Sequence, residues 1–122
     1  MEKTFKVVVC GSRGFKNYEL LKSKLDTLLV NKIDSSRVVI LSGCARGADI
    51  CGENYAIESW LDIERFPAQW EKYGKSAGPR RNELMLQQAD AVVAFWDGKS
   101  RGTAHMIEIT RKSGKPLRVV NY

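Results

Sequence analysis

The sequence has little of what builds metal centres, disulfide frameworks or membrane spans. Only one of its 122 residues is histidine, and its three cysteines have neither the even count nor the Cys-x-x-Cys spacing of a disulfide or zinc framework. No apolar run approaches the roughly 20 residues of a transmembrane helix, and the first one ends at Gly11, too early for a signal peptide. We therefore expect a cytoplasmic protein with reduced thiols, no required cofactor, no metal and no membrane partner.

The composition is that of an ordinary globular protein. Hydrophobic residues make up 43% of the chain and charged residues 28%, with no repeat, linker or low-complexity tract. We expect one domain over residues 1–122, large enough to bury a core without disulfides. The net charge of +6 favours anionic partners, a class that includes nucleotides, nucleic acid and acidic proteins.

Five short apolar runs predict β-strands, at residues 5–10, 37–41, 61–66, 91–96 and 117–120. Four helical patterns separate them, at about 17–31, 48–60, 79–88 and 102–113, with Asn17 as a cap and Gly114 as a stop. The alternating run 61–66 is typical of an edge strand. The stretch 68–77 is polar and aromatic without periodicity, so it is interpreted as an irregular, mobile lid.

This alternation of strands and helices predicts an α/β fold, a three-layer Rossmann-like sandwich with a mostly parallel five-stranded sheet. With the strand order 3-2-1-4-5, the loops at Gly11 and Gly98 flank the point where the topology reverses. Open α/β sheets bind their ligands at that point.

Four polar, glycine-containing segments follow the strands and meet at this one edge. Glycine lets backbone N–H groups approach an anion, helix N-termini add donors, and arginine adds bidentate contacts to phosphate. The candidate ligand-binding residues are Gly11, Ser12, Arg13, Ser42, Gly43, Arg46, Gly47, Asp49, Arg80, Arg81, Asn82, Asp97, Gly98, Ser100, Gly102 and Thr103.

Arg80 and Arg81 give the sharpest argument for an anion, because cations in the first turn of a helix oppose its dipole. The alternative is that both reach into solvent or pair with Glu83. Arg46 could bind the ligand or pair with Asp49. Asp49, in turn, is either a first-turn acid that stabilises its helix or a contact to a ribose hydroxyl.

His105 and three aromatic residues have open roles. His105 is a candidate general acid or base because its ordinary pKa lies near neutrality, although a lone histidine also serves as a simple hydrogen-bonding residue. Trp70 and Tyr73 could stack on a base or pack within the lid. Trp96 could stack as well, but core packing is the favoured role.

Segments 9–15, 41–49, 78–85 and 102–107 together resemble the SLOG superfamily of Rossmann-like proteins, and within it the YspA/YpsA-related branch. The resemblance implies a nucleotide or nucleotide-derived ligand and a homo-oligomer. The segment Ser-Gly-Cys-Ala-Arg-Gly-Ala-Asp is also similar to a loop of the DNA-processing protein A family, whose members bind single-stranded DNA. A single-stranded nucleic-acid binder is therefore the alternative function.

The Lonely-guy phosphoribohydrolases, another branch, use an arginine in Arg-Lys-x-x-Met and a glutamate in Gly-Thr-x-x-Glu. Arg81 matches that arginine, but Asn82 replaces the lysine and Met106 stands at the glutamate position. Glu108 lies about 200° further round a helix, so it is a poor substitute. The resemblance thus implies binding, as a sensor. Any reaction would be hydrolysis of an N-glycosidic or phosphoester bond, with Arg81 and His105 as the catalytic candidates.

Overall fold

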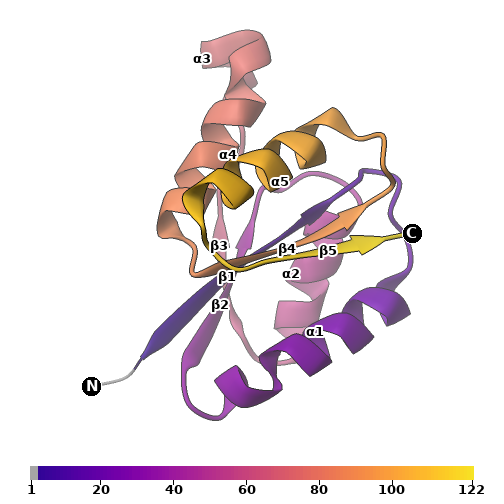
Figure 1. Ribbon diagram of the computed structural model, residues 1–122, viewed down its shortest axis with the longest axis vertical. Helices are drawn as coiled ribbons and strands as arrows, with labels where there is room; N and C mark the ends of the chain where they lie inside the picture. The colour runs from indigo at the N-terminus through magenta and orange to yellow at the C-terminus, as the bar shows by residue number, and fades with distance from the viewer. Residues whose placement is uncertain (1–2) are drawn as a thin grey trace.

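The computed structural model describes residues 3–122, which form one sheet with helices on both faces (Figure 1). Its elements are β1 (Thr4–Gly11), α1 (Tyr18–Ile33), β2 (Arg37–Ser42), α2 (Ala48–Glu58), β3 (Asp62–Arg65), α3 (Trp70–Tyr73), the 3₁₀ turn η1 (Gly74–Ser76), α4 (Ala77–Gln88), β4 (Ala91–Trp96), α5 (Arg101–Ser113) and β5 (Leu117–Asn121). The predicted α/β fold is confirmed.

The sheet has the order β3-β2-β1-β4-β5, which is the order under which the Gly11 and Gly98 loops are expected to flank the reversal. Every neighbouring pair of strands is parallel, so the carboxyl ends of all five strands lie at one edge. β1 is central and pairs with both β2 and β4. The topology reverses between β1 and β4, which places their two following loops side by side.

Alternation along the central strand divides the core into two layers. Val7 and Val9 of β1 pack on one face with residues of α1 and α2, whereas Val8 and Cys10 pack on the other with residues of α4 and α5. In Figure 1, α1 and α2 lie below the sheet, and α4 and α5 lie above it. Both faces are covered, which explains why the strands read as unbroken apolar runs.

Predicted local signals match the observed ends of the elements. The Asn17 side chain accepts a hydrogen bond from the Leu20 N–H at 3.0 Å and caps α1. Gly114 ends α5 in the left-handed conformation, with φ of 77°. β3 lies at the sheet edge and is half exposed, as its alternating sequence indicates.

The prediction of an irregular segment at 68–77 is wrong. It contains α3 and η1, and η1 runs directly into α4, which begins at Ala77 rather than at Pro79. Both α3 and η1 are too short for a helical spacing of apolar residues to show in the sequence. Because of this earlier start, Arg81 is the fifth residue of its helix, so the argument from first-turn cations does not apply to it.

The loops after β1 and β2 meet at a close backbone approach. The Ala48 N–H donates to the Ser12 carbonyl, and Gly47, with φ of 79°, leaves no room for a side chain against that same carbonyl. This contact fixes Arg13 beside the start of α2. Over residues 3–122, no helix is long and apolar enough to cross a membrane.

Candidate functional site

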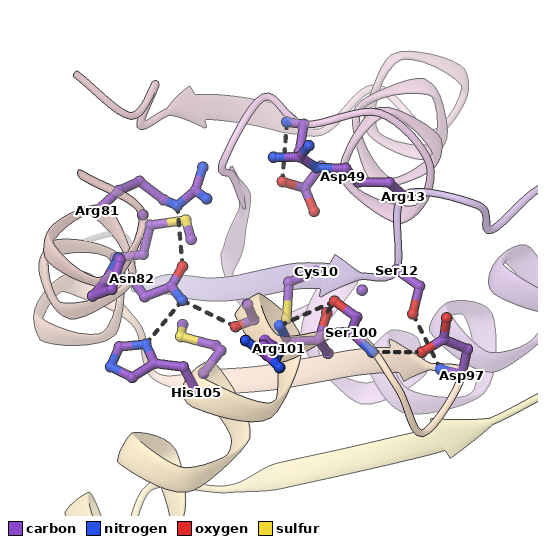
Figure 2. Close-up of a pocket in the computed structure, with 18 of the residues that line it drawn as sticks. Cys10, Ser12, Arg13, Asp49, Arg81, Asn82, Asp97, Ser100, Arg101 and His105 are labelled. Atoms are coloured by element: carbon purple, nitrogen blue, oxygen red, sulfur yellow. Dashed lines mark hydrogen bonds between the residues drawn. The ribbon is translucent and has the colours of Figure 1, made fainter. Parts of the chain in front are cut away.

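A cleft of about 630 Å³ opens at the carboxyl edge of the sheet. It lies between the loops after β1 and β4 and the facing ends of α4 and α5 (Figure 2). Of the predicted site residues, those that line it are Gly11, Ser12, Arg13, Asp49, Arg81, Asn82, Asp97, Ser100, Gly102, Thr103 and His105. The topology therefore brings eleven of the predicted residues to one cleft.

One wall of the cleft is a capped turn that starts α5. Asp97 Oδ1 accepts hydrogen bonds from the Lys99 and Ser100 N–H groups, both at 2.8 Å, and the Asp97 N–H donates to Ser12 Oγ at 3.1 Å. These backbone donors lower the pKa of the Asp97 carboxyl, so it stays ionised. The Ser100 hydroxyl caps α5, and the first turn of that helix faces the cleft with its positive end.

A hydrogen-bonded chain of side chains forms the opposite wall. The Arg81 guanidinium donates to the Gly43 carbonyl at 2.6 Å and to Asn82 Oδ1 at 3.0 Å. The buried Asn82 amide then joins α4 to α5, with Nδ2 lying 3.2 Å from the Gly102 carbonyl and 3.1 Å from His105 Nδ1. Arg81 thus neither pairs with Glu83 nor extends into solvent.

The contact with Asn82 determines which ring nitrogen of a neutral His105 carries the proton. An amide nitrogen donates only, so His105 Nδ1 accepts, and a neutral ring carries its proton on Nε2. Nδ1 is therefore already occupied by Asn82. This arrangement places His105 in the wall of the cleft as a hydrogen-bonded residue.

Asp49 is the buried acid of the cleft, with 5% of its surface exposed. Burial raises the pKa of its carboxyl to about 6, and Glu53 adds to the rise, while the Ala45 N–H, Arg81 and Arg13 oppose it. Asp49 Oδ2 accepts from the Ala45 N–H at 3.2 Å, and Figure 2 shows the other oxygen directed into the cleft. The cations acting on Asp49 are Arg81 and Arg13, so the alternative pairing with Arg46 is wrong.

The other predicted site residues lie outside the main cleft. Gly43 and Arg46 line an adjoining cavity, and Arg80 lines a third, where its guanidinium stacks over the Tyr73 ring. Ser42 is fully buried and donates to Glu53 at 2.6 Å. Gly47 makes the backbone approach described above.

Gly98 adopts φ of 80° in the turn before α5, with no atom within 4 Å of a Cβ built there. It lines none of the three cavities. Its place in the site stays a prediction.

Sequence reasoning missed Arg101, which lines the cleft at the first residue of α5. Its position in a glycine-containing loop after a strand was a signal that could have identified it. The sequence leaves Trp70 a choice between stacking on a base and packing in the lid, and the structure places it in the walls of both the main cleft and the adjoining cavity. Trp96 packs against the core and donates its indole N–H to the Ser100 carbonyl at 3.0 Å, which agrees with the favoured packing role.

The cleft combines three guanidinium groups, from Arg13, Arg81 and Arg101, with the carboxyl groups of Asp49 and Asp97. Such a set suits an anionic ligand that also carries hydroxyl or amino donors. Within residues 3–122, no group of three or more histidine, cysteine, aspartate or glutamate side chains is placed to hold a metal ion.

The fold is shared with solved proteins of low sequence identity. The chain superposes on DNA processing protein A from Streptococcus pneumoniae with a TM-score of 0.69, 16% identity, and coverage of 96% of this chain and 50% of that one. For DNA processing protein A from Helicobacter pylori, whose structure is described by its single-stranded DNA binding mode, the TM-score is 0.65, identity is 22%, and coverage is 94% of this chain and 64% of that one. For the protein TM1055 the TM-score is 0.63 and the sequence identity is 21%, with 96% of this chain and 72% of TM1055 covered.

This chain thus spans about half to two thirds of the DNA processing proteins that it matches. Over nearly its full length it is 32% identical to the Gene 61 protein of Mycobacterium phage D29, covering 96% of this chain and 95% of that protein. Residues 5–73 match the model of a family described as YspA, cpYpsA-related SLOG. The chain therefore belongs to the YspA, cpYpsA-related SLOG family.

Proposed function

We propose that the main cleft binds a nucleotide or a nucleotide-derived ligand. The observation that carries the proposal is the convergence of three arginines, each from a different segment, on a cleft that also receives the first turn of α5. Guanidinium groups and a helix N-terminus both favour phosphate. The volume of about 630 Å³ lies within the range of small-molecule sites.

The two acids of the cleft would orient the rest of the ligand. Asp97 is ionised and exposed, and Asp49 presents one oxygen to the cleft, so both can accept hydrogen bonds from ribose hydroxyls or base amino groups. Carboxylate acceptors beside arginines would discriminate a nucleotide from a bare phosphate. This arrangement supports binding whether or not a reaction follows.

If the bound nucleotide is hydrolysed at an N-glycosidic or phosphoester bond, Asp49 is better placed than His105 to move a proton. Burial raises the pKa of the Asp49 carboxyl to about 6 and one of its oxygens is directed into the cleft, whereas His105 has only Nε2 left for proton transfer because Nδ1 is engaged by Asn82. Incubation with AMP, followed by chromatographic separation of adenine, adenosine and phosphate, distinguishes a hydrolase from a sensor.

Replacing Arg101 with alanine is expected to weaken AMP binding about tenfold while leaving the fold intact, because Arg101 is an exposed side chain that lines the cleft. At an AMP concentration 100 times the wild-type dissociation constant, AMP stabilises the wild type by about 2.7 kcal/mol and would stabilise the variant by about 1.4 kcal/mol. Thermal unfolding with and without AMP measures the difference.

The matched control is Arg111→Ala, which removes an exposed arginine from the last turn of the same helix. It should leave the AMP-induced shift unchanged. Equal shifts in the wild type and both variants would remove Arg101 from the site. No shift in the wild type, with AMP or with any other nucleotide, would contradict the proposed function.

Single-stranded nucleic acid is the second candidate ligand. It is favoured by the likeness in fold to two DNA processing proteins, one described as binding single-stranded DNA, and by the net charge of +6. Binding across several phosphates releases counterions, so affinity for an oligonucleotide should fall steeply with salt. Fluorescence anisotropy between 50 and 200 mM salt, roughly, tests this, since a pocketed mononucleotide should show only a shallow dependence.

A further inference from the structure

A second cavity of about 320 Å³ adjoins the main cleft on the side of β2 and β3. Arg13, Ala45, Trp70 and Arg81 line both cavities, so the two share a wall. The remaining walls of the second cavity come from the loop after β2, including Gly43 and Arg46, and from the segment after β3. The binding of one nucleotide in the main cleft does not account for this space.

The second cavity differs from the main cleft in its charge. Its lining includes Arg13, Arg46 and Arg81 but no carboxylate, whereas the main cleft contains Asp49 and Asp97. Arg46 is exposed, and among residues 3–122 its side chain makes no hydrogen bond or ion pair. Unpaired guanidinium groups that line a cavity favour an anionic occupant.

The loop that carries Arg46 is held in one conformation. Ser42 Oγ donates a hydrogen bond to the buried Glu53 carboxylate at 2.6 Å and accepts one from the Cys44 N–H at 3.1 Å. The Glu53 carboxylate also accepts a hydrogen bond from the Arg65 guanidinium at 2.9 Å. Cys44 has φ of 66°, a left-handed conformation that is uncommon for a residue with a side chain. The buried network therefore maintains a strained turn that presents Ala45 and Arg46 to the cavity.

Trp70 stands between the two cavities with 51% of its surface exposed. Gly78 makes space for the indole, since a Cβ built there would lie 3.3 Å from the ring. Every nucleobase has a π-face, so an exposed indole can stack on a base without regard to its identity. A tryptophan at the boundary can contact a ligand that occupies both cavities.

We propose that the second cavity is a second nucleotide subsite, and that the ligand consists of two nucleoside units joined through phosphate. The joining phosphate lies at Arg13 and Arg81, which line both cavities, and the second unit or its phosphate reaches Arg46. This inference rests on the proposed function, because it assigns the first unit to the main cleft. It deepens that function by naming the class of ligand.

The test is calorimetric titration with three probes, namely AMP, the 5′-phosphorylated dinucleotide pApA, and diadenosine pyrophosphate. The last two join adenosines through a phosphodiester and a pyrophosphate, so they distinguish a nucleic-acid fragment from a pyrophosphate-linked dinucleotide. At least one of them should bind about tenfold more tightly than AMP. Arg46→Ala should remove this advantage and leave AMP affinity unchanged, and Arg111→Ala should change neither affinity.

Several results would overturn the inference. Equal affinities for AMP and both dinucleotides would leave the proposed function standing and remove the second subsite. A loss of AMP affinity in Arg46→Ala equal to the loss for the dinucleotide would assign Arg46 to the first site. Tight binding of a long single strand while both dinucleotides fail would replace the subsite with a nucleic-acid interface, and failure of all probes would reject the proposed function as well.

Discussion

Gly47→Ala is expected to lower the free energy of unfolding by about 3 kcal/mol or more. The backbone of Gly47 has φ of 79°, which strains any residue with a side chain, and a Cβ would lie 2.3 Å from the Ser12 carbonyl oxygen and 2.6 Å from that of Arg13. Both oxygens are backbone atoms, so neither can rotate away. Urea denaturation of the variant and the wild type at neutral pH measures the loss.

Gly114→Ala is the matched control, because Gly114 has nearly the same φ of 77° but no atom within 4 Å of a built Cβ. It should cost only the conformational strain, roughly 1 kcal/mol. If the two variants lost the same stability, the contact between the loops after β1 and β2 would be unimportant. The displaced Ser12 and Arg13 should also weaken AMP binding in Gly47→Ala alone.

Asp49→Asn is expected to stabilise the protein by up to about 3 kcal/mol at pH 8 and to have little effect below about pH 4. The native state raises the pKa of this carboxyl from 3.8 to about 6, so it binds the proton more tightly than the unfolded chain does. The contribution of the Asp49 carboxyl to the free energy of unfolding is therefore greatest at low pH, and it falls as pH rises from the unfolded pKa of 3.8 through the native pKa of about 6. Asparagine keeps an acceptor for the Ala45 N–H without the charge.

The measurement is the free energy of unfolding of Asp49→Asn and the wild type from pH 4 to pH 8. Asp97→Asn provides a control of opposite sign, because the pKa of Asp97 is lowered and its ionised form is favoured in the native state. Compared with the wild type, that variant should be less stable at every pH above the ordinary pKa of aspartate, and the difference should shrink as pH falls below it. An Asp49→Asn variant less stable than the wild type at pH 8 would show that the Asp49 charge stabilises the fold.

The sheet was predictable because its signals are local. Each buried strand, such as Val38–Leu41 within β2, is a continuous apolar run, and the alternation of strands with helices predicts parallel pairing with right-handed crossovers. The strand order itself is one of the two common orders of such folds and is not fixed by handedness. The cap at Asn17 and the stop at Gly114 depend on residues within one turn of the helix end. The edge at which the candidate residues gather follows from the same topology.

The partners of the candidate side chains were not predictable in the same way. Arg81 donates to Gly43, 38 residues earlier, and Asn82 meets His105, 23 residues later. Such contacts depend on how two helices and a loop pack, which no spacing in the sequence records. The raised pKa of Asp49 has the same origin, because burial by distant segments is its main cause.

The pairing of β1 with β4 joins segments that lie far apart in the chain. The Lys6 N–H bonds to Asp90 across 84 residues, so joining the two central strands closes a loop of most of the chain. Loop closure of this kind carries an entropic cost before its contacts form, and a high proportion of such contacts slows folding. The cleft lies between the loops that these two strands carry, so it is absent from any intermediate that holds only β1, β2 and β3.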